Sequence, residues 1–164
     1  SSFVLITFMQ VPVAHYGLWL TLHVTGFVAG NLFMIRYSRV INAPPLMLAG
    51  GVIATLAGLA MVILSYFEIY HPLAVLLPMG LFTFGYGVSV PSATARALLP
   101  YADIAGTASA LMGFVQILFS AIGGTTIGFL LVDNPMPMAL VIFAFGLMSL
   151  ISIGLILKDQ ALRN

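Results

Sequence analysis

The stretch SVPSATARALLPYADIAGTASALMGFVQILFSAIGGTTIGFLL, residues 89–131, indicates how the whole chain is built. It joins two long apolar runs through a short hinge that carries Arg96 and Asp103. A run of small residues, AGTASALMGF, opens the second apolar run. The rest of the chain repeats this plan of apolar run, short polar hinge and apolar run.

The composition sets the class of protein. The chain has 164 residues, of which 62% are hydrophobic and only 5% charged, whereas soluble domains carry about 25% charged residues. Five basic and four acidic residues are too few to cover a surface that faces water. We therefore expect lipid to be the solvent, and an all-α polytopic membrane protein to be the fold class.

The apolar runs predict a single membrane domain over residues 1–164 with six helical segments. The first ten residues rise only about half of the roughly 30 Å hydrocarbon core. We therefore expect five complete transmembrane helices and one truncated N-terminal helix, in a chain that is a piece of something longer. The predicted spans are approximately 1–11, 16–35, 46–67, 73–95, 104–132 and 138–157.

All basic residues follow the second, fourth and sixth segments, and none lies in the opposite hinges. They are Arg36, Arg39, Arg96, Lys158 and Arg163. By the positive-inside rule these hinges and the C-terminus are cytoplasmic. Arg36, Arg39 and Arg96 are interpreted as cytoplasmic anchors. The alternative is that they pair with helix C-terminal ends or acidic partners and hold a gate closed.

Small residues at helical spacing predict where helices approach one another closely in lipid. Gly26 and Gly30 form a GxxxG pair in the second segment, and Gly124 and Gly128 form another in the fifth. Both pairs are interpreted as helix-packing positions. The functional alternative is a glycine-rich helix that slides or bends, as a transporter needs.

Polar residues inside the spans are the candidates for function, because burying them in lipid is costly. For His23, a neutral imidazole hydrogen-bonded to a neighbouring helix stands against a cavity or proton-linked role. For Gln116, an interhelical hydrogen bond stands against cavity lining. Gln10 lies near the outer end of the first segment.

The sequence excludes several other classes. It contains no cysteine, and His15, His23 and His71 lack the spacing of a metal site. No catalytic constellation is present at membrane depth, so we expect no enzyme and no cofactor. No basic patch supports binding to nucleic acid.

Six segments with a basic cytoplasmic side resemble the C-terminal half, helices seven to twelve, of a major facilitator superfamily transporter. GNLFMIRYSR, residues 30–39, resembles the superfamily motif between helices eight and nine, with Met34 where the fuller pattern has an acidic residue. FTFGYGVSVPSATARAL, residues 82–98, is similar to the tenth helix of the Bcr/CflA drug-resistance family. AGTASALMGFVQ, residues 105–116, resembles the start of the eleventh.

The resemblance implies proton-driven efflux of small, often apolar compounds across a bacterial inner membrane by alternating access. The implied partners are the lipid bilayer, a drug-like or metabolite substrate, protons and a missing N-terminal six-helix half. The implied cavity is lined by the first, second, fourth and fifth segments. Its candidate residues are Gln10, His23, Asn31, Tyr86 and Gln116.

Two rival functions remain open from the sequence. One is a small structural or assembly membrane protein that acts through its GxxxG faces. The other is a half-size transporter that works as a dimer.

Overall fold

The computed structural model describes residues 13–38, 43–67, 72–130 and 136–163, and within these ranges the secondary structure is entirely helical. The all-α prediction is confirmed for this part of the chain. The elements are α1 (Val13–Tyr37), α2 (Ala43–Tyr66), α3 (Pro72–Leu98), the 3-10 helix η2 (Leu99–Ile104), α4 (Ala105–Leu130) and α5 (Met136–Arg163). Each α-helix overlaps one of the predicted spans from the second onward, and the first predicted span, 1–11, lies outside the described residues.

Prolines help to set where the helices begin. The predicted third span began at residue 46, but α2 begins at Ala43 and includes Pro44 and Pro45 in its first turn. Proline is tolerated there because the first backbone N–H groups of a helix have no partner within it. Pro44 and Pro45 are therefore part of α2 and do not separate it from the preceding hinge.

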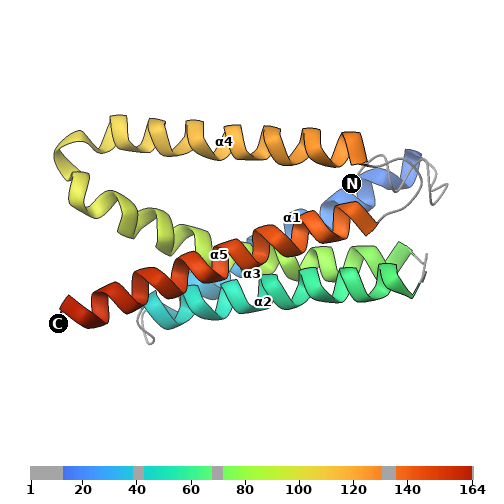
Figure 1. Cartoon of the computed structure of the whole chain (residues 1–164), viewed down its shortest axis with the longest axis horizontal. Helices are drawn as coiled ribbons and strands as arrows, with labels where there is room; N and C mark the ends of the chain where they lie inside the picture. Colours follow the sequence, from blue (N-terminus) through green and yellow to red (C-terminus); the bar gives the residue numbers. More distant parts are fainter. Residues whose placement is uncertain (1–12, 39–42, 68–71, 131–135, 164) are drawn as a thin grey trace.

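The connection from α3 to α4 is a tight turn rather than an extended loop. Helix α3 continues past Pro91 to Leu98. The 3-10 helix η2 follows, and Tyr101 within it leaves helical geometry at φ −118° and ψ 32°. Because the chain turns here, α4 runs back along the length of the molecule (Figure 1).

Three helical stretches among the described residues are long and apolar enough to cross a membrane. They are Pro44–Tyr66, Leu73–Thr126 and Met136–Lys158. The prediction of five complete spans is therefore only partly supported. The 54-residue second stretch joins two predicted spans, because helical and apolar character continues through η2. Helix α1 overlaps the predicted span 16–35 and is not among the three.

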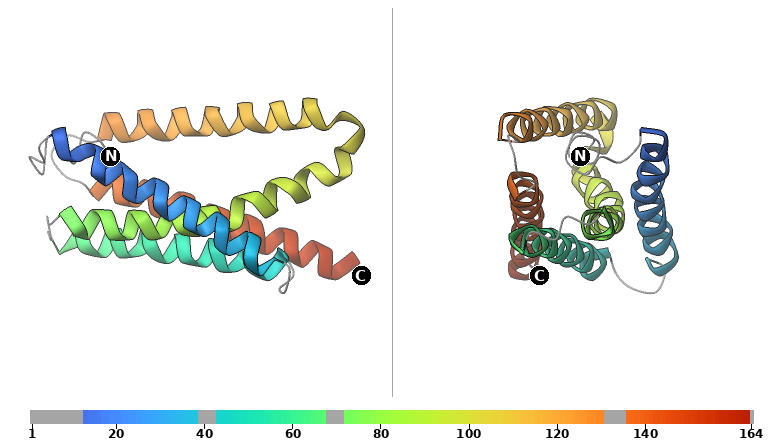
Figure 2. Two further views of the ribbon diagram at one scale, coloured as in Figure 1. Left: turned by 180° about the vertical axis from the view of Figure 1, so that it is seen from behind. Right: turned by 90° about the vertical axis from the view of Figure 1, so that its right-hand side faces the viewer.

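The helices form a packed layer and one helix apart from it. The end-on view in Figure 2 shows α3 at the centre, between α1 and α2, with α5 beside α2. The most extensive contacts are between α2 and α3, α1 and α3, and α2 and α5. Helix α4 has few contacts with either α3 or α5 and lies along one side (Figures 1 and 2).

Glycines bring α1 against α3. A Cβ atom at Gly26 would lie 2.6 Å from the carbonyl oxygen of Gly80. One at Gly30 would overlap the carbonyl oxygen of Phe84 and lie 3.2 Å from Gly87 Cα. The backbones therefore meet where the sequence placed its first GxxxG pair.

Helix α2 approaches both of its neighbours in the same way. A Cβ atom at Gly85 of α3 would lie 2.6 Å from the carbonyl oxygen of Gly50, and one at Gly58 would lie 2.8 Å from Phe143 Cα of α5. The Ser89 hydroxyl adds an interhelical hydrogen bond by donating to the Met47 carbonyl oxygen at 3.1 Å. An apolar cluster closes the layer: Met61, Val75, Met138 and Ala139.

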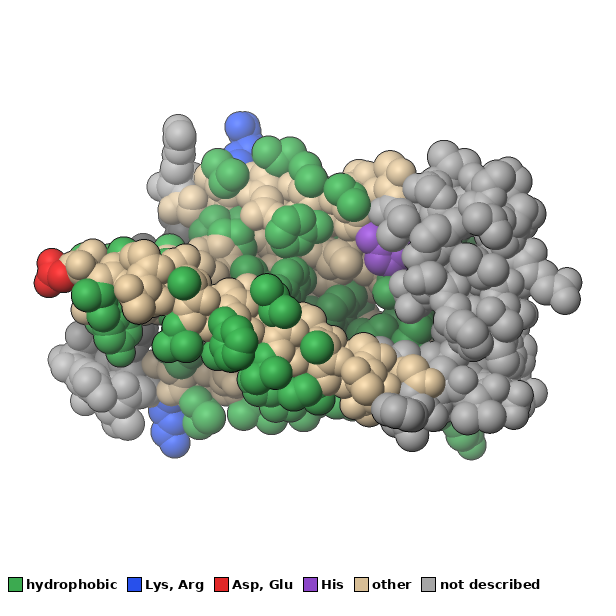
Figure 3. Space-filling view, turned by 90° about the horizontal axis from the view of Figure 1, so that it is seen from above, with side chains coloured by type: hydrophobic (Ala, Val, Ile, Leu, Met, Phe, Trp, Pro, Cys, Tyr) green, Lys and Arg blue, Asp and Glu red, His purple; other side chains and the backbone are tan. Residues whose placement is uncertain are grey.

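The surface matches a lipid environment. In the face shown in Figure 3, apolar side chains spread along the described helices, and the visible charged side chains lie toward the left. That is the end at which α1, α3 and α5 finish (Figure 1), and Arg36 and Arg96 occupy the last turns of α1 and α3. The described charges are therefore concentrated at one end of the bundle.

Candidate functional site

A cavity of about 590 Å³ opens between α2, α3, α4 and α5, a size within the usual range of small-molecule sites. It exists because α4 stands away from the packed layer. It is lined by Gly51, Ala54, Phe82, Tyr86, Ser89, Val90, Val115, Gln116, Phe119, Ser120, Gly123, Gly124, Val141, Ile142, Phe145, Gly146 and Ser149.

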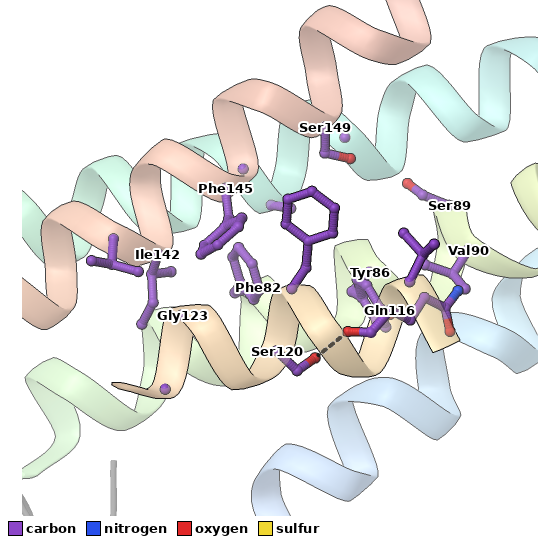
Figure 4. A pocket seen from close by; sticks show the side chains of 17 residues that line it. Phe82, Tyr86, Ser89, Val90, Gln116, Ser120, Gly123, Ile142, Phe145 and Ser149 are labelled. Carbon is purple, nitrogen blue, oxygen red and sulfur yellow. Dashed lines mark hydrogen bonds between the residues drawn. The ribbon is translucent and has the colours of Figure 1, made fainter. Parts of the chain in front are cut away.

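Aromatic rings enter the pocket from three helices. Phe82 and Tyr86 come from α3, Phe119 from α4 and Phe145 from α5. Phe82 and Phe145 lie on opposing helices in the close view of Figure 4. Rings of this kind supply large apolar contact areas and stack on planar ligands.

The polar groups of the pocket are few. Ser89 donates to the Met47 carbonyl oxygen, and Ser120 donates to the carbonyl oxygen of Gln116 at 2.8 Å. The Gln116 side chain extends from α4 toward α3, beside Tyr86 and Val90 (Figure 4). Its amide makes no hydrogen bond to another described residue, so it can both donate to and accept from a ligand.

No charged side chain is among the residues that line the pocket. The described residues also contain no group of three or more His, Cys, Asp or Glu side chains placed to hold a metal ion. The pocket can therefore bind through apolar contact, ring stacking and a small number of hydrogen bonds.

Two of the predicted cavity residues, Tyr86 and Gln116, meet in this pocket. His23 and Asn31 are half-buried on α1, which contributes no lining residue. The Asn31 amide donates to the Phe27 carbonyl oxygen of its own helix at 2.9 Å. Gln10 lies outside the described residues.

The helices around the pocket differ from those expected to line a cavity. The resemblance implied the first, second, fourth and fifth segments, whereas this pocket has α2 and α5 together with α3 and α4. Gly51 and Ala54 of α2 and Gly146 of α5 are the small residues of this lining. The pocket therefore contains Tyr86 and Gln116 of the predicted cavity residues, together with two helices that were not among the expected segments.

Several lining residues were not singled out from the sequence. Phe82, Phe119, Phe145 and Ser149 belong to apolar helices in which many similar residues face lipid. The available signal was the combination of aromatic residues with small residues on neighbouring segments. That signal becomes specific only when the helix order around the pocket is known.

Of the remaining candidates, Gly124 lines the pocket, whereas Arg36 and Arg96 do not. Arg36 is exposed and Arg96 half-buried, each in the last turn of a helix, where a cation interacts favourably with the helix dipole. Arg39 lies outside the described residues. A Cβ atom added at Gly124 or Gly128 would meet no described atom within 4 Å, so the close contact predicted for this pair stays a prediction.

Comparison with known proteins gives one informative match. No protein-family model matches the chain, and no solved structure matches it. The chain is 32% identical over 114 residues to Multidrug resistance protein D of Escherichia coli (strain K12). The alignment covers 70% of this chain and 25% of that protein, so the chain spans about a quarter of its relative. Together with the apolar helices, the match supports a multi-pass bacterial membrane protein of the transporter class and the resemblance to the major facilitator superfamily.

Proposed function

We propose that the chain forms the C-terminal six-helix half of a proton-coupled efflux carrier of the Bcr/CflA type. The carrier exports drug-like molecules or small metabolites across a bacterial inner membrane by alternating access. The proposal depends most on the apolar, aromatic pocket, found in a chain similar to a multidrug resistance protein. Such a lining binds by shape and apolar contact, which permits broad specificity.

The packing of α1 weighs against the rival role in assembly. An assembly protein would present its GxxxG faces to partners, but the Gly26–Gly30 face is already covered by α3. No described residue packs against the Gly124–Gly128 face. Because this face is available to a second copy of the chain, the half-size dimer remains the second candidate. The oligomeric state of the complete gene product in detergent separates the dimer from the carrier.

The proposed orientation places the end with Arg36 and Arg96 in the cytoplasm. The 164 residues contain no cysteine, so single-cysteine variants in this part report orientation once any cysteine elsewhere in the gene product has been replaced by serine. Ser38→Cys lies just after α1 and Phe67→Cys just after α2, at opposite ends of the bundle. In intact cells we expect a membrane-impermeant maleimide to label Phe67→Cys and not Ser38→Cys. The reverse pattern would invert the orientation.

Transport is tested with the complete gene in a bacterium that lacks its main efflux pumps. We expect lower accumulation of a panel of fluorescent small molecules in these cells, and loss of that effect when a protonophore collapses the proton gradient. Equal accumulation in cells carrying an empty vector would contradict the function. Efflux that persists with the protonophore would contradict the coupling.

Residue roles follow from variants in the same assay. We expect Gln116→Ala to change which molecules are exported, because Gln116 lines the pocket. We expect His23→Ala to lower the dependence on the proton gradient if the imidazole is proton-linked. Ser152→Ala is the matched control, because its hydroxyl donates to the Met148 carbonyl of its own helix at 2.8 Å and does not line the pocket.

A further inference from the structure

We infer that the pocket between α2, α3, α4 and α5 selects uncharged aromatic molecules that carry one amide-like hydrogen-bonding group. The inference deepens the proposed function, since it rests on this pocket being the place where a small molecule binds. It names a ligand class that the similarity to a multidrug resistance protein does not supply.

The exclusion of charge follows from the lining. Among the described residues that line the pocket there is no Asp, Glu, Lys, Arg or His side chain. Arg96 is ten positions beyond Tyr86 on α3, which places it about 15 Å farther along the helix axis. A charged ligand would lose its hydration without gaining a counter-ion, and this loss is large in an apolar site.

The aromatic residues raise the question whether the pocket prefers cations. Ring faces attract cations through the quadrupole of the ring. Here the rings of Phe82, Phe119 and Phe145 come without any carboxylate in the lining. Ring attraction alone is much weaker than the hydration that an organic cation loses, so the rings favour neutral planar ligands.

The hydrogen-bonding preference comes from Gln116. Ser89 and Ser120 already donate their hydroxyl protons to backbone carbonyl groups, and Tyr86 and Ser149 each add only a single hydroxyl to the lining. The Gln116 amide makes no hydrogen bond to another described residue, and it lines the pocket beside Tyr86. A primary amide offers two N–H donors and one carbonyl acceptor. An amide on the ligand can accept from an N–H group of Gln116 and donate to its carbonyl oxygen. A carboxylate can only accept, and an ammonium group can only donate.

The test uses probes that share one ring system and differ in charge. They are 1-naphthamide, which is neutral, 1-naphthoate, which is anionic, and protonated 1-naphthylmethylamine, which is cationic. Binding to the complete gene product in detergent is measured by equilibrium dialysis. Partition into micelles is subtracted with protein-free micelles of the same detergent at the same concentration.

We expect 1-naphthamide to bind at least roughly tenfold more tightly than either ion, because only the ions lose hydration without compensation. An equal or tighter affinity for the cation overturns the inference. This comparison uses the natural protein, so it does not depend on whether any variant folds.

Variants at position 116 sharpen the result. We expect Gln116→Leu to weaken the binding of 1-naphthamide roughly five- to tenfold, the usual effect of one lost hydrogen bond. The affinity for 1-methylnaphthalene, which has no amide, should change by less than about twofold. We expect Gln116→Glu to make the cationic probe the preferred one, because it supplies the missing counter-ion. An unchanged affinity of Gln116→Leu for the amide would remove Gln116 from the site.

The two proposals fail separately. If the probes bind in the expected order but cells with the gene accumulate the dyes normally, the transport function is wrong and the ligand class stands. If cells export the dyes but the cationic probe binds best, the ligand class is wrong and the carrier stands.

Discussion

Helix α3 and helix α4 are similar in length and composition but differ in packing. On α3, Gly80 and Gly87 meet α1, and Gly85 meets α2, at distances that leave no room for a Cβ atom. On α4, the glycines at positions 106, 113, 124 and 128 meet no described atom within 4 Å. A GxxxG spacing on one helix, such as Gly124–Gly128, is therefore not sufficient for close packing against a described neighbour.

The difference should appear most strongly in core truncations. Leu76 of α3 is fully buried, whereas Ile117 of α4 is 72% exposed. We expect Leu76→Ala to lower the free energy of unfolding by about 2–5 kcal/mol. Ile117→Ala should stay within about 0.5 kcal/mol. The measurement is reversible unfolding in mixed micelles, and equal losses would show that α4 packs as tightly as α3.

The second test adds a single methyl group to each helix. A Cβ atom at Gly85 would lie 2.6 Å from the Gly50 carbonyl oxygen, whereas Gly113 is open. We expect Gly85→Ala to destabilise the protein by about 1–3 kcal/mol through overpacking. Gly113→Ala should be neutral or stabilising by up to about 1 kcal/mol, since alanine is the better helix former. Two changes of the same sign in thermal unfolding midpoints would contradict the comparison.

The third test compares two serines that differ in what they bond. Ser89 connects α3 to α2, whereas Ser120 bonds only within α4. We expect Ser89→Ala to cost about 1 kcal/mol, the typical value for an interhelical hydrogen bond in membranes. The Ser120→Ala variant should change the same unfolding free energy by less than about 0.5 kcal/mol.

The smallest effect on stability belongs to a pocket-filling change. Gly124 lines the pocket and has no described atom within 4 Å of its Cβ position. We expect Gly124→Leu to leave the unfolding free energy within about 0.5 kcal/mol while it abolishes binding of 1-naphthamide. Loss of stability of the size expected for Gly85→Ala would mean that α4 is covered on this side.

The helical fold could be read from the chain because composition and hydropathy act locally. Runs such as 46–67 are long, apolar and bounded by polar hinges, so lipid forces their backbones into helices. The sequence did not show that α2 begins at Ala43, because Pro44 and Pro45 are compatible with a first turn. It also did not show that η2 carries helical, apolar character across a predicted break.

The site was harder to predict, because it depends on which helices become neighbours. Gln116 was identified because polar atoms are conspicuous in apolar segments, and Tyr86 because the resemblance implied a cavity lined by the fourth segment. Phe145 has no such mark, and its role appears only when α5 faces α4 across the pocket. Asn31 was conspicuous for the same reason as Gln116, yet its amide hydrogen-bonds within α1.

The hydrogen bonds of the hydroxyl side chains bear on how sequence change in this protein should be interpreted. Thr25, Thr55, Thr125 and Ser152 each donate to the carbonyl oxygen four residues earlier in their own helix. Their outer surface toward lipid or a neighbouring helix is therefore nearly that of valine or alanine. We expect Thr→Val exchange at the exposed positions Thr25 and Thr125 to be close to silent. Divergence there between homologues would carry little information about cargo, whereas a change at Gln116 would carry much.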